Sequence, residues 1–199
     1  MNLIDSLIAE GWLKTPQIIK AFKKIKRIDF LPQESKDLAE LNEALPIGLG
    51  QTISQPLVVA FMLELLCLEP GQKVLDIGSG SGWTSTLLSE IIGNHGKVIA
   101  IEVVSDLKEF GQKNATKYEN NIEFICANGV NGYLPHAPYD RILASASLQE
   151  QLPQAWKDQL KTDGIIVTPI RSSIWMYRKM ADRKFEEKEY PGFVFVPFI

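Results

Sequence analysis

A glycine-rich turn between an apolar run and a helical segment constrains this chain more than any other feature of its sequence. Residues 74–83 read Val-Leu-Asp-Ile-Gly-Ser-Gly-Ser-Gly-Trp, and a helix-compatible segment follows at 84–91. Gly78 and Gly80 allow the backbone to turn sharply and to approach a ligand closely. A strand, a glycine turn and a helix in this order predict an α/β fold whose ligand binds at the carboxyl end of the strand.

The rest of the chain supports a mostly parallel sheet. After Gly71, short β-rich runs alternate with helical segments, as in successive βαβ units. We expect parallel strands at 73–77, 97–102, 122–126, 141–144 and 164–168. Beyond Pro169 the pattern becomes all-β, and two further strands, 174–180 and 193–198, are expected to pair antiparallel. Residues 1–56 are expected to form a helical extension with a connecting loop, and residues 57–199 the core of a single domain.

The residues around the turn narrow the class of ligand. A dinucleotide site needs Gly or Ala at the last spaced position of the turn, where this chain has Trp83. Asp76 at the strand end suits a cationic or hydroxyl-bearing group, and Glu102, which ends the second strand, suits the two vicinal hydroxyls of a ribose. A nucleoside without phosphates and with a positively charged tail fits this set. S-adenosylmethionine is such a ligand.

Each of these residues also has a plainer interpretation. The glycine turn occurs in tight connections that bind nothing. Glu102 could be a surface acid at a strand end. Asn128-Gly129, which follows the third strand at the same edge of the sheet, is a common turn sequence.

Charge and hydropathy argue against several other classes. A net charge of -3 provides no general attraction for nucleic acid. One basic group is expected to be the solvated face of an amphipathic helix; it comprises Lys20, Lys23, Lys24, Lys26 and Arg27. The longest apolar run, 57–63, is far shorter than the ~20 residues of a membrane span, and the first ten residues lack a secretory signal pattern. We therefore expect a cytoplasmic monomer that binds neither nucleic acid nor a membrane.

The cysteines and histidines provide no sign of a metal site. Cys67 and Cys126 lie far apart within apolar segments, which predicts buried, reduced thiols. His95 and His136 stand alone in expected loops. No metal is therefore predicted.

Residues 45–56, Leu-Pro-Ile-Gly-Leu-Gly-Gln-Thr-Ile-Ser-Gln-Pro, carry the most specific resemblance to a known family. They resemble the signature loop of the protein-L-isoaspartate (D-aspartate) O-methyltransferases, and we call them the signature loop. Similar short matches occur at 27–32, 137–140, 159–160 and 195–198, so that the resemblance covers nearly the whole chain. Enzymes of this family methylate the α-carboxylate of isoaspartyl residues in damaged proteins.

The resemblance implies a Rossmann-like S-adenosylmethionine-dependent methyltransferase fold, with helices on both faces of the sheet, and isoaspartyl-containing peptides and proteins as substrates. The cofactor-binding residues it implies are Ile53, Ser54, Asp76, Gly78, Ser79, Gly80, Glu102, Val103, Asn128 and Gly129. It places Thr52, Ile53 and Ser54 at the junction with the substrate. Ser54 is the candidate catalytic residue, donating a hydrogen bond to the substrate carboxylate. The plainer interpretation is that Ser54 caps the helix expected from Leu57 onward.

Two alternatives remain open, and departures from the family pattern favour the first of them. The chain has Asn128 where the family has Asp, Glu40 and Asn42 where it has Tyr and Asp, and Arg-Ser-Ser at 171–173 in place of a Gly-rich segment. One alternative is a methyltransferase for another peptide or small molecule, and the other is a non-catalytic homologue that binds S-adenosylmethionine.

Because a carboxylate is already ionised, its methylation needs no general base.

Overall fold

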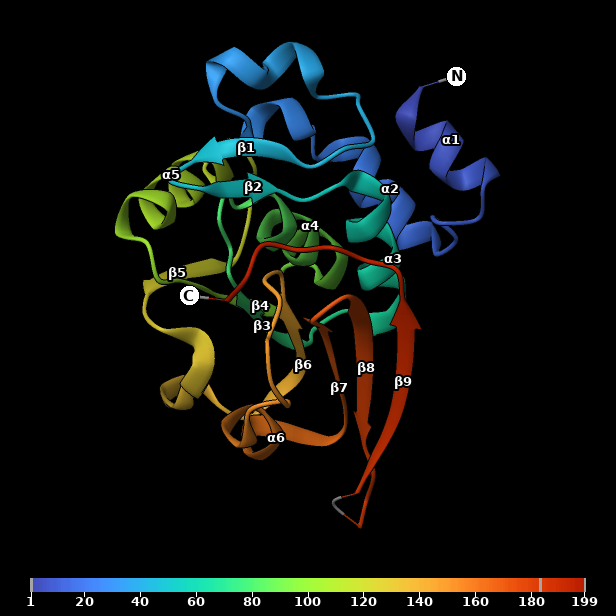
Figure 1. The fold of residues 1–199 in the computed structure, drawn as a ribbon, viewed down its shortest axis with the longest axis vertical. Coiled ribbons are helices and arrows are strands. Elements are labelled where there is room, and N and C mark those ends of the chain that lie inside the picture. Colours follow the sequence, from blue (N-terminus) through green and yellow to red (C-terminus); the bar gives the residue numbers. More distant parts are fainter. Residues whose placement is uncertain (1, 183, 199) are drawn as a thin grey trace.

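A seven-stranded sheet forms the centre of the computed structural model, which describes residues 2–182 and 184–198 (Figure 1). The strands run in the order β5–β4–β3–β6–β7–β8–β9. Their bounds are β3 Lys73–Ile77, β4 Lys97–Glu102, β5 Ile122–Cys126, β6 Tyr139–Ala144, β7 Leu160–Ile170, β8 Ser173–Lys179 and β9 Phe185–Pro191. Strands β3 to β7 are parallel, and β8 and β9 are antiparallel to their neighbours. The predicted mostly parallel sheet with antiparallel C-terminal strands is confirmed.

The core helices are α3 Pro56–Leu66, α4 Trp83–Ile92, α5 Ser105–Ala115 and α6 Gln154–Gln159, and 3₁₀ turns lie at η3 Gly129–Asn131 and η4 Leu134–His136. Successive side chains of a strand point to opposite faces of the sheet. On one face, Val74 and its neighbours pack into an apolar cluster with α3, α4, α5 and the helices of the N-terminal extension. On the other face, Leu75 and its neighbours pack with Trp156 of the short helix α6. The first face is therefore covered by more helices than the second.

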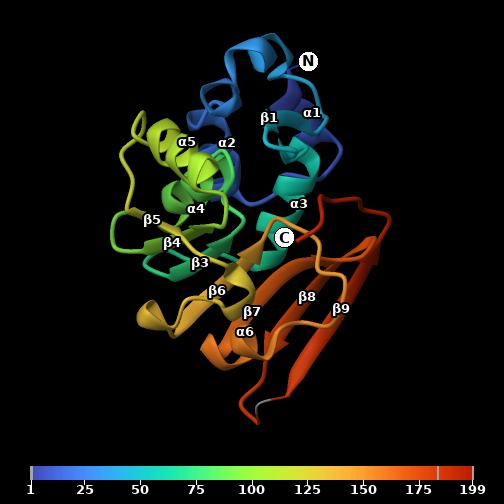
Figure 2. The ribbon, with the colours of Figure 1, turned by 60° about the vertical axis from the view of Figure 1, so that its left-hand side comes forward.

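The N-terminal extension lies over the end of the sheet toward which the parallel strands run (Figure 2). It consists of α1 Leu3–Ala9, α2 Pro16–Lys24 and the 3₁₀ helices η1 Arg27–Phe30 and η2 Gln33–Leu38. The signature loop follows and forms a small antiparallel hairpin, β1 Leu45–Gly48 and β2 Gln51–Ile53. Leu7 and Phe22 of the extension are buried in the same apolar cluster as Leu87 of α4. The extension and the core therefore share one interior.

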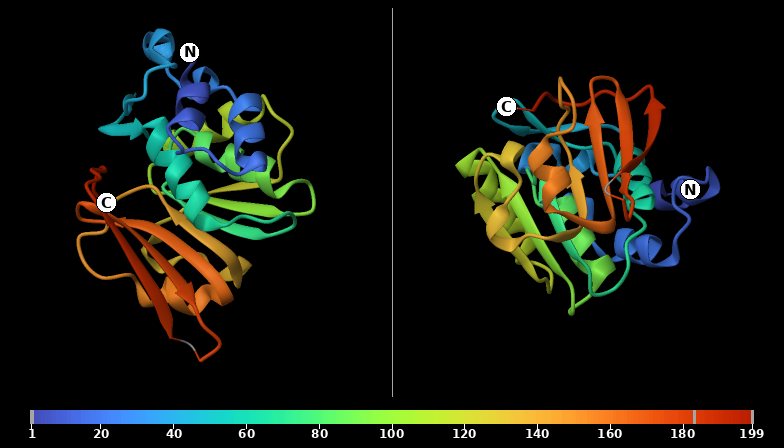
Figure 3. Two further views of the ribbon diagram at one scale, coloured as in Figure 1. Left: turned by 90° about the vertical axis from the view of Figure 1, so that its right-hand side faces the viewer. Right: turned by 90° about the horizontal axis from the view of Figure 1, so that it is seen from below.

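The last strand is not where the sequence predicted it. Residues 193–198 were expected to form a strand, but the edge strand is β9, and the later segment contains only an isolated bridge at Pro197. The sequence did not indicate β9, because residues 186–189 are four consecutive charged residues. Exposed edge strands often carry such charges, which discourage further strand pairing. The apolar segment 193–198 instead leaves the sheet and runs back across its carboxyl edge (Figure 3).

Two predictions of side-chain exposure are also wrong. Both cysteines are exposed, because Cys67 is the left-handed C-cap of α3 and Cys126 ends the edge strand β5. Arg27 is only 6% exposed, although it was assigned to a solvated basic face, whereas Lys20 and Lys26 are exposed as expected. Among the described helices, none is both long and apolar enough to cross a membrane.

Candidate active site

A cleft lies where the chain order of the sheet reverses, at the carboxyl ends of β3, β4 and β6, which is the usual ligand position in open α/β sheets. It is surrounded by the signature loop, the glycine turn, the ends of β4 and β6, the residues that follow β5, and the C-terminal tail. The residues that line it are Ile47, Gln51, Thr52, Ile53, Ser54, Ile77, Gly78, Ser79, Gly80, Ser81, Thr84, Ile101, Glu102, Val103, Ala127, Gly129, Ser145, Ala146, Val196, Pro197 and Phe198.

The glycine turn adopts the sharp conformation that its sequence predicted. Gly78 and Gly80 have φ angles of +80° and +48°, which a residue with a Cβ adopts only with strain. The backbone amides of Gly78 and Ser79 donate to the carbonyl of Ile101 at 2.8 and 3.0 Å, which fastens the turn to the end of β4. The predicted residues Gly78, Ser79 and Gly80 all line the cleft.

Glu102 also lies on the cleft and braces the turn. One carboxylate oxygen accepts from the amide of Gly80 at 2.9 Å, and the other accepts from the amide of Val104 at 3.1 Å. The residue is only 7% exposed, so its carboxylate is held in place rather than free in solvent. Each oxygen keeps a lone pair for a further donor. Val103, which is exposed beside it, lines the same wall.

Asp76 lies beneath the turn and does not line the cleft. It is completely buried, and Ser85 Oγ donates to its Oδ2 at 2.5 Å. Its Oδ1 has no hydrogen-bond partner among the described residues. The pKa of Asp76 is raised to about 7, mainly by burial, which the Ser85 hydrogen bond opposes and the nearby carboxylate of Glu102 reinforces. The structure therefore places this acid below the ligand space.

Asn128 and Gly129 follow β5, but only Gly129 lines the cleft. Gly129 is buried in the cleft wall, where an added Cβ would come within 2.2 Å of Ile77 Cγ2, so that only glycine fits. Asn128 is exposed, is not part of the lining, and uses its Oδ1 to accept from the amide of Val130 at 2.9 Å. Asn128 therefore begins the η3 turn.

The signature loop borders two connected spaces. Thr52 and Ser54 line both the main cleft and a groove next to it, while Ile53, which is 3% exposed, lines the main cleft alone. Ser54 does not cap α3, because the N-cap is Gln55 and the amide of Leu57 donates to Asn42 Oδ1 at 3.0 Å. Capping is therefore supplied by Asn42, and this leaves the side chain of Ser54 at the junction of the two spaces.

Two parts of the cleft were not identified from the sequence. Ser145 and Ala146 line it immediately after β6, and Val196, Pro197 and Phe198 of the C-terminal tail close its side. The tail is held by two hydrogen bonds with Ser147, whose amide donates to Val196 O at 2.8 Å and whose carbonyl accepts from the amide of Phe198 at 2.9 Å. The signal for Ser145 was its place at the end of a predicted strand. No local signal indicated the return of the tail.

His136 is not solitary, although the sequence indicated an isolated loop residue. Its Nε2 lies 3.2 Å from Glu123 Oε1, and its ring stacks on Tyr133. Neither partner lines the cleft, so this pair lies outside the candidate site.

The sheet order, the acidic end of β4 and the glycine turn define the Rossmann-like fold of S-adenosylmethionine-dependent methyltransferases. Within that class, residues 1–199 match the family model for protein-L-isoaspartate(D-aspartate) O-methyltransferase. The chain belongs to this family of O-methyltransferases.

Two curated relatives, both protein-L-isoaspartate O-methyltransferases, are similar over the full length of the chain. The Methanopyrus kandleri protein is 36% identical, and the match covers 100% of this chain and 90% of the relative. The Thermococcus sibiricus protein is 38% identical, with coverage of 100% and 92%.

Solved structures agree on the fold. A protein-L-isoaspartate O-methyltransferase superposes with a TM-score of 0.88 at 27% identity, and the match covers 98% of this chain but only 64% of that chain. A Plasmodium falciparum protein assigned to the same family, in complex with S-adenosyl-L-homocysteine, superposes with a TM-score of 0.86 at 21% identity, with coverage of 100% and 99%.

Proposed function

We propose that this protein transfers a methyl group from S-adenosylmethionine to the α-carboxylate of L-isoaspartyl residues in damaged proteins and peptides. The observation that carries the proposal is the placement of the signature loop, because Thr52 and Ser54 border both the cleft of the glycine turn and the adjoining groove. Membership of the O-methyltransferase family supports the same reaction.

The residues of the main cleft fit S-adenosylmethionine. Glu102 presents a fixed carboxylate that can accept from the two ribose hydroxyls. Val103, Ala127 and Gly129 make an apolar wall for the adenine ring. Beneath the turn, Asp76 Oδ1 has no hydrogen-bond partner among the described residues, and in its ionised form this carboxylate would attract a cationic methionine portion. A pyrophosphate group would favour a basic side chain in the cleft wall. Among the described residues, no basic side chain lines the cleft.

The adjoining groove fits the peptide substrate. Its lining combines the signature loop and the residue before it, the start of α3, the end of β6 and the C-terminal tail, through Ala44, Thr52, Ser54, Gln55, Val58, Ser145, Val194, Phe195 and Val196. All of these side chains are uncharged, so that a carboxylate placed there loses part of its hydration. In this setting the Ser54 hydroxyl can donate to one carboxylate oxygen and leave the other facing the methyl donor.

The chemistry requires alignment more than proton transfer. When bound, S-adenosylmethionine supplies a sulfonium methyl group, whose bond to sulfur breaks as the bond to the carboxylate oxygen forms, leaving a neutral thioether. An α-carboxylate with an ordinary pKa near 3.5 is already ionised at neutral pH, so the acceptor needs no base. Ser54 and Thr52 would orient that carboxylate, while the tail residues 196–198 exclude water from the cleft.

Transfer of a labelled methyl group tests this function. We expect purified protein to label an isoaspartyl peptide and to leave its aspartyl twin unlabelled, and the label to be released by mild base, as a methyl ester requires. Label on another acceptor would indicate a methyltransferase of different specificity. Binding of S-adenosylmethionine without transfer to any acceptor would indicate the non-catalytic homologue.

We further propose that residues 1–199 act as a single methyltransferase domain, because the N-terminal helices and the core share one apolar interior. The proposed setting is a cytoplasmic monomer that engages neither nucleic acid nor a membrane. The net charge of -3 supports this choice of partners.

A further inference from the structure

Beyond the proposed function, on which this inference rests, we infer that Arg27 is a positioning residue that holds the Ser54 side of the cleft at a set distance from the glycine turn. Arg27 does not line the main cleft. Its role therefore runs through the backbone that it binds.

The guanidinium of Arg27 donates hydrogen bonds to backbone carbonyls of two separate segments, residues 39–43 and residue 54. Its Nη1 donates to the carbonyls of Ala39 and Leu41 at 3.3 and 2.9 Å. Its Nη2 donates to the carbonyl of Glu43 at 2.6 Å and to that of Ser54 at 3.2 Å. A planar guanidinium with several fixed donors can join these acceptors at once, which a single ammonium cannot do.

The same side chain also packs against the first residue of the helix that follows the glycine turn. Its guanidinium carbon lies 5.5 Å from the centre of the Trp83 ring, and Trp83 begins α4 directly after the turn. Trp83 is 3% exposed and packs edge-on against Phe22, so it provides a fixed surface. Arg27 thus lies between two elements of the proposed site. One is the backbone of Ser54, which is proposed to orient the substrate carboxylate, and the other is the start of the helix that follows the glycine turn.

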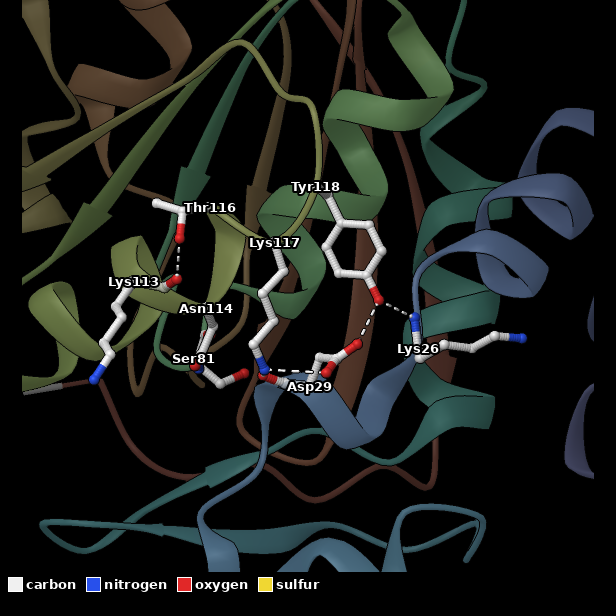
Figure 4. A network of polar contacts seen from close by, with 8 residues as sticks. All are labelled: Lys26, Asp29, Ser81, Lys113, Asn114, Thr116, Lys117 and Tyr118. Atoms are coloured by element: carbon white, nitrogen blue, oxygen red, sulfur yellow. Dashed lines mark hydrogen bonds and ion pairs between the residues drawn. The ribbon is translucent and has the colours of Figure 1, made fainter.

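The residues on either side of Arg27 in the chain, Lys26 and Asp29, are held by the turn that follows α5 (Figure 4). The Tyr118 hydroxyl donates to Asp29 Oδ2 at 2.7 Å and accepts from the amide of Lys26 at 2.9 Å. Lys117 Nζ donates to Asp29 Oδ1 at 3.0 Å. Within α5 itself, Asn114 Nδ2 donates to the carbonyl of Ser81 at 3.1 Å. Helix α5 and the turn that follows it therefore hold both η1 and the glycine turn.

Charge and burial make this arrangement specific to arginine. Burial lowers the pKa of Arg27 to about 10, while the carboxylate of Glu40 opposes the shift, so the guanidinium stays charged at neutral pH. A buried cation in contact with four carbonyl oxygens holds them more strongly than a neutral donor would. Replacing it changes the path of residues 39–43 and of residue 54 together.

The test compares Arg27→Lys with Arg141→Lys. Arg141 is a matched control, because it is 8% exposed and donates to the carbonyls of Leu66, Cys67 and Asp140, outside the cleft. We expect both variants to lower the melting temperature. At a temperature where each is folded, only Arg27→Lys should lower kcat on an isoaspartyl peptide, by about 10- to 100-fold, with the Kd for S-adenosylmethionine changed less than about 2-fold.

Amide hydrogen exchange gives a readout that does not depend on activity. Peptides covering 51–57 should exchange faster in Arg27→Lys than in the wild type, peptides covering 79–83 should not, and Arg141→Lys should leave both unchanged. An inactive wild-type protein would remove the proposed function, while exchange would still test the positioning role.

Three outcomes would overturn the inference: a wild-type kcat in Arg27→Lys, an equal loss of kcat in Arg141→Lys, or unchanged exchange at 51–57. If Arg27→Lys does not fold, Tyr118→Phe replaces it, since this variant removes only the hydroxyl that joins Lys26 and Asp29. It should lower kcat by about 3- to 10-fold, and a wild-type value would count against the inference equally.

Discussion

Asp76 provides a quantitative test of the buried acid beneath the glycine turn. The change is Asp76→Asn, which preserves the size of the side chain and an acceptor for Ser85 Oγ but removes the titration. Burial raises the pKa of Asp76 from its ordinary 3.8 to about 7 in the folded protein. In the unfolded chain the group ionises near 3.8, so the two states bind different numbers of protons between these pH values.

The sign and size of the effect follow from that difference. Between pH 3.8 and about 7 the folded state keeps a proton that the unfolded state has lost, so the free energy of unfolding falls as pH rises. Above about pH 7 this contribution is constant, because Asp76 is then ionised in both states. At ~1.36 kcal/mol per pH unit, the loss between pH 5 and pH 8 amounts to ~2–3 kcal/mol. Asp76→Asn removes this component.

Urea denaturation of both proteins without ligand, at pH 5, 6, 7 and 8, measures the effect. All other titrating groups are common to the two proteins, so the difference between their pH profiles isolates Asp76. The wild type should lose ~2–3 kcal/mol more than Asp76→Asn between pH 5 and pH 8, with the difference levelling off above pH 7. Parallel profiles would refute the reasoning, since they would show that Asp76 ionises at its ordinary pKa in the folded protein.

Three further predictions concern the cleft. Glu102→Ala should weaken S-adenosylmethionine binding by ~1–3 kcal/mol in calorimetry, through loss of charge-assisted hydrogen bonds to the ribose, and an unchanged Kd would make Glu102 only a brace for Gly80. Ser54→Ala should lower kcat about tenfold or more at unchanged cofactor affinity, and its melting temperature should hold because Asn42 supplies the helix cap; full activity would contradict the assigned role. Asn128→Asp should preserve or tighten cofactor binding, since a carboxylate is the stronger acceptor, and a large loss measured by calorimetry would show that the amide donor is needed.

Local sequence was sufficient for the turn and the strands around it. Residues 74–83 combine an apolar strand, glycines where φ must be positive, and a helix start, and each of these preferences acts within a few residues. The strands at 73–77, 97–102 and 122–126 were predicted at their observed bounds, because each is a short β-rich run that alternates with helical segments. The position of Glu102 followed from the same pattern.

Features that depend on distant segments could not be obtained in this way. Strand β9 was missed because it contains four consecutive charged residues, and its place is decided by pairing with β8. Of the apolar run 193–198, which was predicted to be a strand, residues 196–198 became part of the cleft wall. The basic residue Arg27 was assigned to a solvated face by its spacing, yet carbonyls from residues 39–43 and 54 surround it. No pattern within one helix reports where those carbonyls will lie.

By itself, the sequence determined the α/β class, the glycine turn and the resemblance to the O-methyltransferase family, because these depend on short-range backbone preferences and contiguous motifs. Only the tertiary structure decided that Asp76 lies under the cleft, that Asn42 rather than Ser54 caps α3, and that the C-terminal tail closes the site. Burial and hydrogen-bond partners are properties of the packed chain. Residues far apart in sequence compete for the same space and the same donors, and that competition is settled only when the chain is folded.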